Sequence, residues 1–182
     1  MDYYKEKQYI AQVDKNDNVL GKIEKWEAHK KGVLHRAFTM ILYYQDKIIL
    51  QHRKHPVFDG VFDLSFSSHQ IYLGDDLLQD NMDAIYGGLR REWNLKKEDL
   101  KSNPKFIKKI YYKAEDPSSD YTEHEIDYIY TVELKKLPSP NLDFAYGFSL
   151  IEKNKLLSTD SYLLTTLNLA PWVKVMLKEK MI

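Results

Sequence analysis

The alternation of apolar and polar positions predicts most of the strands of this chain. Apolar residues alternate over Tyr9–Val13, the polar cluster Asp14–Asn18 is typical of a turn, and a second alternating stretch follows over Val19–Ile23. These segments predict an N-terminal hairpin. Further strands are predicted over Ala37–Tyr44, Ile48–Gln51, Val61–Phe66, Lys105–Lys113 and Glu125–Leu134.

Helical spacing marks one internal segment and one terminal segment. Between Asp80 and Trp93, the apolar residues Met82, Ile85 and Leu89 recur at intervals of three and four, which is typical of a helix. A last helix is expected after Pro171, because proline suits the first helical turn. Mixed strands with these two helices predict an α/β sandwich, with residues 1–182 forming one domain.

The composition narrows the possible partners. The 27 basic and 27 acidic side chains cancel, so no overall field attracts nucleic acid or an anionic membrane. An anionic substrate would therefore need a local group of cations or a bound metal. The chain has no cysteine, which excludes disulfides, thiolate metal sites and a thiol nucleophile.

Membrane and export signals are not evident in the sequence. No stretch approaches the ~18 apolar residues of a membrane span, and the N-terminal residues MDYYKEKQYI lack the apolar core of a signal peptide. We therefore expect a cytoplasmic protein without nucleic-acid or membrane partners, as a monomer or homodimer.

Three histidines and two glutamates are the candidates for a metal site. They are His29, His35, His69, Glu123 and Glu125. The period of a strand directs Glu123 and Glu125 to one face and the residue between them to the other. Two carboxylates on one face repel each other unless a cation lies between them or one holds a proton. Imidazole with carboxylate suits Zn, Mn, Fe or Mg.

Spacing alone leaves an alternative open. Scattered histidines are often surface or loop residues, and we expect this of His52, His55 and His124. Glu123 and Glu125 would then be a solvated strand end.

The amino-acid sequences of three longer segments favour the metal site. VDKNDNVLGKIEKWEAHKKGVLHRAFTMILYY, YYKAEDPSSDYTEHEIDYIYTVEL and the closing APWV resemble type I isopentenyl diphosphate isomerases of the Nudix superfamily, from about Val13 to Trp172. The resemblance implies a Nudix α/β/α sandwich with a mixed sheet. It also implies a divalent metal, Mg, Mn or Zn, held by the three histidines and two glutamates that were singled out above.

The resemblance also implies a second metal-binding position, on the internal helix. Nudix hydrolases end their motif in several glutamates, whereas here the stretch Gly87–Leu95 keeps only Glu92. The isomerases use that glutamate to bind the Mg²⁺ that arrives with the substrate diphosphate. A hydrolase would need the other carboxylates to collect metal and activate water, so ordinary Nudix hydrolysis is disfavoured.

The proton-transfer residues implied by the family are only partly present. The isomerases move a double bond with a Glu and a Cys on opposite sides of the isoprenoid chain; the Glu is Glu125, but the Cys position holds Ser67. A hydroxyl is far less acidic than a thiol with its pKa of about 8.5, so the activity is expected to be impaired. The alternative is that Ser67 is simply a loop-lining hydroxyl.

The diphosphate site also departs from the family. An arginine near Gly87-Gly88 grips the diphosphate in the isomerases, and two helical glycines cost about 1 kcal/mol each relative to alanine. The candidate cations are Lys25, Arg53, Arg90 and Arg91, although the last two also suit an exposed helix face.

Two aromatic residues complete the predicted site. Tyr112 matches a family tyrosine that orients the carboxylate or a water, and Trp172 matches a tryptophan whose ring stabilises a carbocation-like transition state. Either residue suits a plain core position as well.

The sequence thus predicts an isomerase that interconverts isopentenyl and dimethylallyl diphosphate. A Nudix hydrolase of a diphosphate compound, a non-catalytic diphosphate-binding homologue, and an isomerase-fold enzyme with another substrate are the alternatives.

Overall fold

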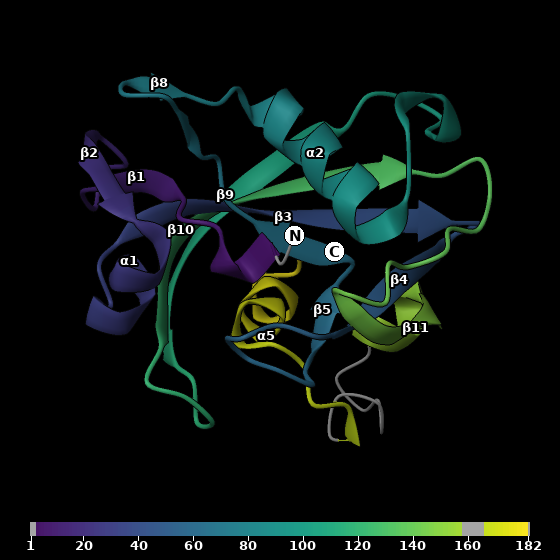
Figure 1. Ribbon diagram of the computed structural model, residues 1–182. Coiled ribbons are helices and arrows are strands. Elements are labelled where there is room, and N and C mark those ends of the chain that lie inside the picture. Colours follow the sequence, from purple (N-terminus) through teal and green to yellow (C-terminus); the bar gives the residue numbers. More distant parts are fainter. Residues whose placement is uncertain (1–2, 158–165, 182) are drawn as a thin grey trace.

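The computed structural model describes residues 3–157 and 166–181, and the centre of its sheet is the long strand β3 (His35–Tyr44) (Figure 1). Strand β10 (Thr122–Glu133) runs parallel to β3 over almost its whole length. A tight turn at Gln45 and Asp46, both with positive φ, leads from β3 into β4 (Lys47–Arg53). The predicted strands of this central region are therefore confirmed.

The other elements surround this centre. The remaining strands are β1 (Tyr9–Val13), β2 (Val19–Glu24), β5 (Phe62–Leu64), β6 (Phe66–Ser68), β7 (Tyr72–Leu73), β8 (Leu77–Leu78), β9 (Lys105–Glu115) and β11 (Ala145–Glu152). The helices are α1 (Lys25–Lys31), α2 (Asn81–Trp93), α3 (Lys153–Leu157) and α5 (Pro171–Lys178), with the short 3₁₀ turns η1 (Tyr3–Lys5) and η2 (Lys97–Asp99).

The main sheet is mixed. Its strands run in the order β11-β4-β3-β1-β2, with β10 beside β3 and β9 antiparallel to β10. The predicted N-terminal hairpin is confirmed as β1 and β2. Helices α2 and α5 lie on opposite faces of this sheet (Figure 1).

Each face of the sheet has its own apolar core. Helix α2 contributes Ile85, Leu89 and Trp93 to one core, and α5 contributes Trp172 and Met176 to the other. The predicted α/β sandwich is confirmed. Among the described residues, no helix is both long and apolar enough to cross a membrane.

Helix α2 has the ends that its sequence predicts. The Asp80 carboxylate caps its N-terminus by accepting a hydrogen bond from Met82 N at 2.7 Å, and Asn94 ends it in a left-handed conformation (φ 53°). Gly88 is required by packing, since a Cβ there would lie 2.4 Å from the ring of Phe66. The neighbouring Gly87 faces open space.

One predicted strand is wrong. Val61–Phe66 does not form a single strand, because Ser65 has φ 69° and interrupts it. The Ser65 hydroxyl accepts a hydrogen bond from the amide of Leu42 on β3 and donates one to the carbonyl of Ile49 on β4. The chain therefore changes partner at Ser65, from β4 to β3.

Candidate functional site

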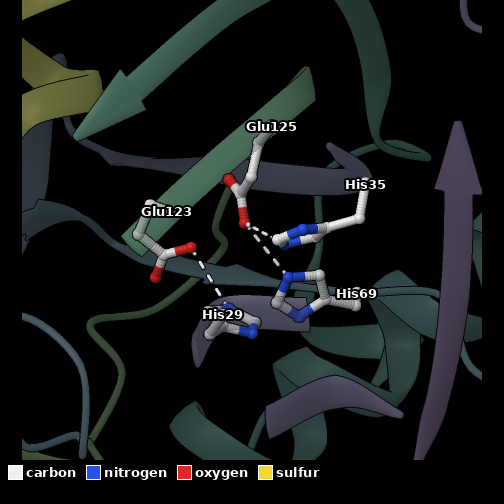
Figure 2. Close-up of side chains that lie close together, drawn as sticks. All are labelled: His29, His35, His69, Glu123 and Glu125. Atoms are coloured by element: carbon white, nitrogen blue, oxygen red, sulfur yellow. Dashed lines mark hydrogen bonds and ion pairs between the residues drawn. The ribbon is translucent and has the colours of Figure 1, made fainter. Parts of the chain in front are cut away.

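The five predicted metal ligands come from four elements that the sheet brings to one end. His29 lies in the last turn of α1, His35 opens β3, His69 follows β6, and Glu123 and Glu125 lie on β10. Their ligand atoms all lie within 4.8 Å of one another. Figure 2 shows the five side chains converging on a common centre.

Strand register sets the position of the two carboxylates. Glu125 is the Cα partner of His35 on β3 and of Tyr112 on β9. Both glutamates are 3% exposed, as expected for two residues on one buried strand face. His124 between them points the other way and contacts the Tyr111 hydroxyl and the carbonyl of Gly32.

The histidine rings are oriented by backbone carbonyls. His29 Nδ1 lies 2.6 Å from the carbonyl of Lys25, and His35 Nδ1 lies 2.7 Å from that of Val33. A carbonyl accepts only, so each Nδ1 carries the proton and each Nε2 of a neutral ring presents a lone pair. This is the second-shell arrangement that orients metal-binding histidines.

Those lone pairs face carboxylate oxygens. His29 Nε2 lies 3.2 Å from Glu123 Oε2, and His35 Nε2 lies 3.3 Å from Glu125 Oε1 (Figure 2). His29 Nε2, His35 Nε2 and Glu123 Oε2 are buried and have no hydrogen-bond partner in the described part of the chain. Two acceptors that face each other at this distance need either a proton or a cation between them. The donor set therefore fits a divalent cation bound by imidazole and carboxylate.

The charges of this cluster are strongly perturbed. Burial raises the pKa of Glu125, but its close partners, a protonated His35 foremost and the Tyr112 hydroxyl next, outweigh burial and bring it to about 2. Burial, reinforced by the charges of His35 and His29, lowers the pKa of His69 well below its usual value. Glu125 is thus an ionised ligand and His69 a neutral one, as metal binding requires.

A cavity lies beside the cluster and brings most of the other predicted residues together. Its lining includes Lys25, Arg53, Ser67, Glu92, Tyr112 and Trp172, together with His69 and both glutamates of the cluster. Both oxygens of Glu92 are held, Oε1 by Arg91 at 2.8 Å and Oε2 by Gln51 at 3.2 Å. The Tyr112 hydroxyl donates to Glu125 Oε2.

Two adjacent arginines of α2 differ in position. Arg90, predicted to bind substrate, lies apart from this cavity, in an exposed depression beside Tyr86 and Lys97. Arg91 lines the cavity, and its Nη2 donates to Ser68 Oγ at 3.0 Å. The Nε of Arg91 is buried without a hydrogen-bond partner among the described residues. Arg91 thus offers a donor that a bound anion would satisfy.

Several lining residues carry no signal in the sequence. Tyr3, Tyr4 and Phe144 cover the cavity, and the Tyr3 ring packs 4.3 Å from the guanidinium of Arg91. They leave a volume of about 20 Å³, which is room for about one water. His55, expected to be a surface or loop residue, lies in the loop after β4 and also lines the cavity. These residues come from the 3₁₀ turn η1 and from loops, whose course the apolar pattern does not specify.

Ser67 stands in a chain of hydrogen bonds between two buried carboxyl groups. Its hydroxyl lies 2.9 Å from Asp63 Oδ2 and 2.8 Å from the hydroxyl of Thr39, which lies 2.7 Å from Asp127 Oδ2. Three contacts need three protons, and the two hydroxyls supply two. One carboxyl therefore holds the third. Burial raises the pKa of both carboxyl groups, and for Asp127, where the charge of Glu125 adds to burial, it lies well above its usual value.

Known proteins of similar sequence include isopentenyl-diphosphate isomerases. Isopentenyl-diphosphate Delta-isomerase 1 of Mus musculus is 27% identical over 177 residues, covering 90% of this chain and 78% of the mouse protein. Isopentenyl-diphosphate delta-isomerase 2 of Homo sapiens is 31% identical over 145 residues, covering 71% of this chain and 62% of the human protein. The sequence matches no protein-family model.

Solved structures of similar fold include Nudix proteins. A Deinococcus radiodurans protein superimposes with a TM-score of 0.68 at 14% identity, covering 94% of this chain and 98% of that one. The MutT NUDIX hydrolase of Burkholderia pseudomallei gives a TM-score of 0.56 at 13% identity, covering 80% of this chain and 96% of the hydrolase. These likenesses concern the fold alone.

Proposed function

We propose, from the premise that this chain is isopentenyl diphosphate isomerase-like and has the Nudix fold, that it interconverts isopentenyl and dimethylallyl diphosphate in a metal-dependent reaction. Residues 1–182 act in this proposal as one domain, monomeric or homodimeric, in the cytoplasm. The substrate is a small diphosphate compound, and the metal at the histidine–glutamate cluster is Mg, Mn or Zn.

The observation that carries the proposal is the set of inward-facing acceptors beside the cavity. Two buried histidine nitrogens and one buried glutamate oxygen have no protein donor within the described residues. The cavity next to them is lined by candidate cations and by the hydroxyls of Ser67 and Tyr112. A bound divalent cation would neutralise the two glutamates and hold them in place.

Glu125 and Tyr112 handle the proton on one side of the substrate. The Glu125 Oε2 atom accepts the Tyr112 hydroxyl, while Oε1 faces His35 and His69. In the proposed reaction one proton is added to a carbon of the substrate and another is removed from a second carbon, so the double bond moves without net oxidation. Ser67 takes part on the other side, in place of a thiol.

The diphosphate is bound in this proposal by cations of the same cavity. Lys25 and Arg53 are each 4% exposed, and Arg91 presents its unpartnered Nε beside them. The buried carboxylate of Glu92 supports a role in holding the Mg²⁺ that accompanies the diphosphate. The position of Arg91 favours it over Arg90 as the third cation.

One observation favours a second candidate, a diphosphate-binding homologue without turnover. The Ser67 hydroxyl is a much weaker acid than a thiol, and general acid–base catalysis contributes typically 10²–10⁴-fold to rate. Binding of the substrate would then persist without isomerisation.

The test is the conversion of isopentenyl diphosphate by the purified, Mg²⁺-loaded protein, with a Glu125→Gln variant as the matched control. Dimethylallyl diphosphate that forms only with the unsubstituted protein supports the isomerase. Bound but unchanged substrate supports the non-catalytic homologue, and released phosphate supports a hydrolase.

A further inference from the structure

Asp63 on β5 is not among the predicted site residues, but its side chain accepts hydrogen bonds from several residues of the cavity wall. Its side chain is 0% exposed and lies behind the wall. The Oδ1 atom accepts hydrogen bonds from Trp172 Nε1 at 2.7 Å and from the amide of Leu64 at 2.7 Å. The Oδ2 atom accepts from Ser67 Oγ at 2.9 Å and from Arg53 Nη1 at 3.4 Å.

Three of these four donors are side chains that line the cavity. Arg53 ends β4, Ser67 lies on β6 and Trp172 lies in the first turn of α5, so they come from three separate elements. The Arg53 guanidinium also lies 5.2 Å from the centre of the Trp172 ring. One carboxylate is therefore the common point at which these three side chains meet.

The donors around Asp63 indicate that its side chain is an ionised carboxylate. The indole, the guanidinium and the amide of Leu64 only donate, so a carboxylate with four acceptor positions matches its surroundings. Burial raises the pKa of Asp63, and the charge of Arg53 together with the hydrogen bonds of Trp172 and Ser67 opposes that rise. A buried carboxylate paired in this way is costly to disturb on one side only.

We infer that Asp63 is a positioning residue, which from behind the cavity wall fixes the orientations of Arg53, Ser67 and Trp172. The inference deepens the proposed function and rests on it for the meaning of these orientations. In this inference Asp63 does not contact the substrate. It influences the binding of the anionic group through Arg53, and the hydrocarbon part of the substrate through Ser67 and Trp172.

Asp63→Asn is the informative substitution. The amide oxygen can still accept from Trp172 and Leu64, whereas the amide nitrogen is a donor. It faces the guanidinium of Arg53, which can only donate, and the hydroxyl of Ser67, which must turn away from its present orientation to accept. Positioning and simple charge then predict opposite results. If Asp63 positions Arg53, the substitution weakens anion binding; if Asp63 merely offsets the charge of Arg53, its removal strengthens anion binding.

The experiment measures the binding of inorganic pyrophosphate with Mg²⁺ in four proteins by calorimetry. They are the unsubstituted protein, Asp63→Asn, Arg53→Gln and the double variant. We expect Asp63→Asn to weaken binding about tenfold, in line with the loss of a charged hydrogen bond, and to have no further effect when Arg53 is already replaced by glutamine. The double variant removes both buried charges and leaves neither unpaired, so we expect it to fold even where a single substitution destabilises the protein.

A second readout needs no ligand. The chain has three tryptophans, and the Trp172 indole signal in a ¹H–¹⁵N NMR spectrum is assigned by Trp172→Phe. We expect this signal to move upfield in Asp63→Asn, because a neutral amide oxygen is a weaker acceptor than a carboxylate, while the Trp26 and Trp93 signals stay in place.

Each outcome decides the inference. Three results overturn it: an unmoved Trp172 signal, tighter pyrophosphate binding in Asp63→Asn, or a loss on Asp63→Asn that is the same with and without the Arg53→Gln substitution. If the unsubstituted protein fails to bind pyrophosphate, the proposed function fails, and the Trp172 signal alone then decides whether Asp63 positions its neighbours.

Discussion

Glu125 and His35 are partners in the parallel register of β10 and β3, and their side chains meet at 3.3 Å between Oε1 and Nε2. This pairing ties the candidate metal centre to the alignment of the two central strands. A slip of one residue in β10 would turn Glu123 and Glu125 to the opposite face. The same register places Tyr112 beside Glu125 from β9.

Metal binding should depend on the clustered histidines and not on the others. We expect His35→Ala to lower the affinity for a divalent cation at least tenfold, because second-shell changes alone cost 10–100-fold. A chelator should lower the melting temperature of the unsubstituted protein, because a cation that binds only the folded state stabilises it. Calorimetry and thermal unfolding measure the two effects.

His52→Ala is the control for the metal experiment, since His52 stacks on Phe62 away from the cluster. Equal metal affinity in the two variants would contradict the assignment of His35 as a ligand.

Ser67→Cys should increase the rate of isomerisation. A thiol has a pKa of about 8.5, and positioned general acid–base catalysis is worth roughly 10²–10⁴-fold, so a gain of at least tenfold in kcat is expected. Because the chain has no other cysteine, iodoacetamide should abolish the gain by alkylating this one residue. Ser68→Cys, one position along the same cavity wall, should give no gain. A Ser67→Cys protein no faster than the unsubstituted one would contradict the role of this position.

The two arginines of α2 should differ in their effect on anion binding. We expect Arg91→Gln to weaken the binding of pyrophosphate about tenfold, because its Nε is a buried donor that lacks a partner in the described chain. Arg90→Gln removes the same charge from an exposed position and should change the dissociation constant less than twofold. Equal losses would mean that net charge, and not the cavity position of Arg91, determines binding.

Asp17 should contribute to stability in a pH-dependent way. Burial raises its pKa, but hydrogen bonds from Lys109, Tyr128 and Arg36 outweigh burial and hold the pKa below its usual value. A lowered folded-state pKa stabilises the protein above the unfolded value of about 3.9, and this stability is lost as the pH falls through the folded-state pKa. Asp17→Asn should therefore cost about 1–2 kcal/mol at pH 7 and progressively less below pH 4.

Asp46→Asn is the matched control for Asp17. Asp46 also has a positive φ, of 61°, but it is exposed and forms no ion pair within the described residues. Denaturant unfolding at several pH values should show no change for this variant, whereas a pH-independent loss for Asp17→Asn would refute the ionic explanation.

The apolar pattern predicts the strands and helices whose burial is periodic. It predicts β3 and α2 well because their apolar positions follow one face or fill the interior. It misses the break at Ser65, because a positive φ at a serine depends on hydrogen bonds to Leu42 and Ile49, which lie far away in the sequence.

The sequence also predicts the metal cluster better than it predicts the cavity wall. Glu123 and Glu125 can be assigned to one face from the strand period, and the family resemblance supplies the histidines. The choice of Arg91 over Arg90 depends on the rotation of α2 against the cavity, which the sequence does not specify. Asp63 gives no signal, because an aspartate in a short strand is ordinary until its partners are known.

The most direct test of the central claim is an NMR assay of the Mg²⁺-loaded protein with isopentenyl diphosphate in D₂O. The account predicts dimethylallyl diphosphate that carries deuterium, formed slowly by the unsubstituted protein, faster by Ser67→Cys, and not at all by Glu125→Gln. An intact, metal-bound protein that forms no isomerised product, even with the Ser67→Cys substitution, would contradict it.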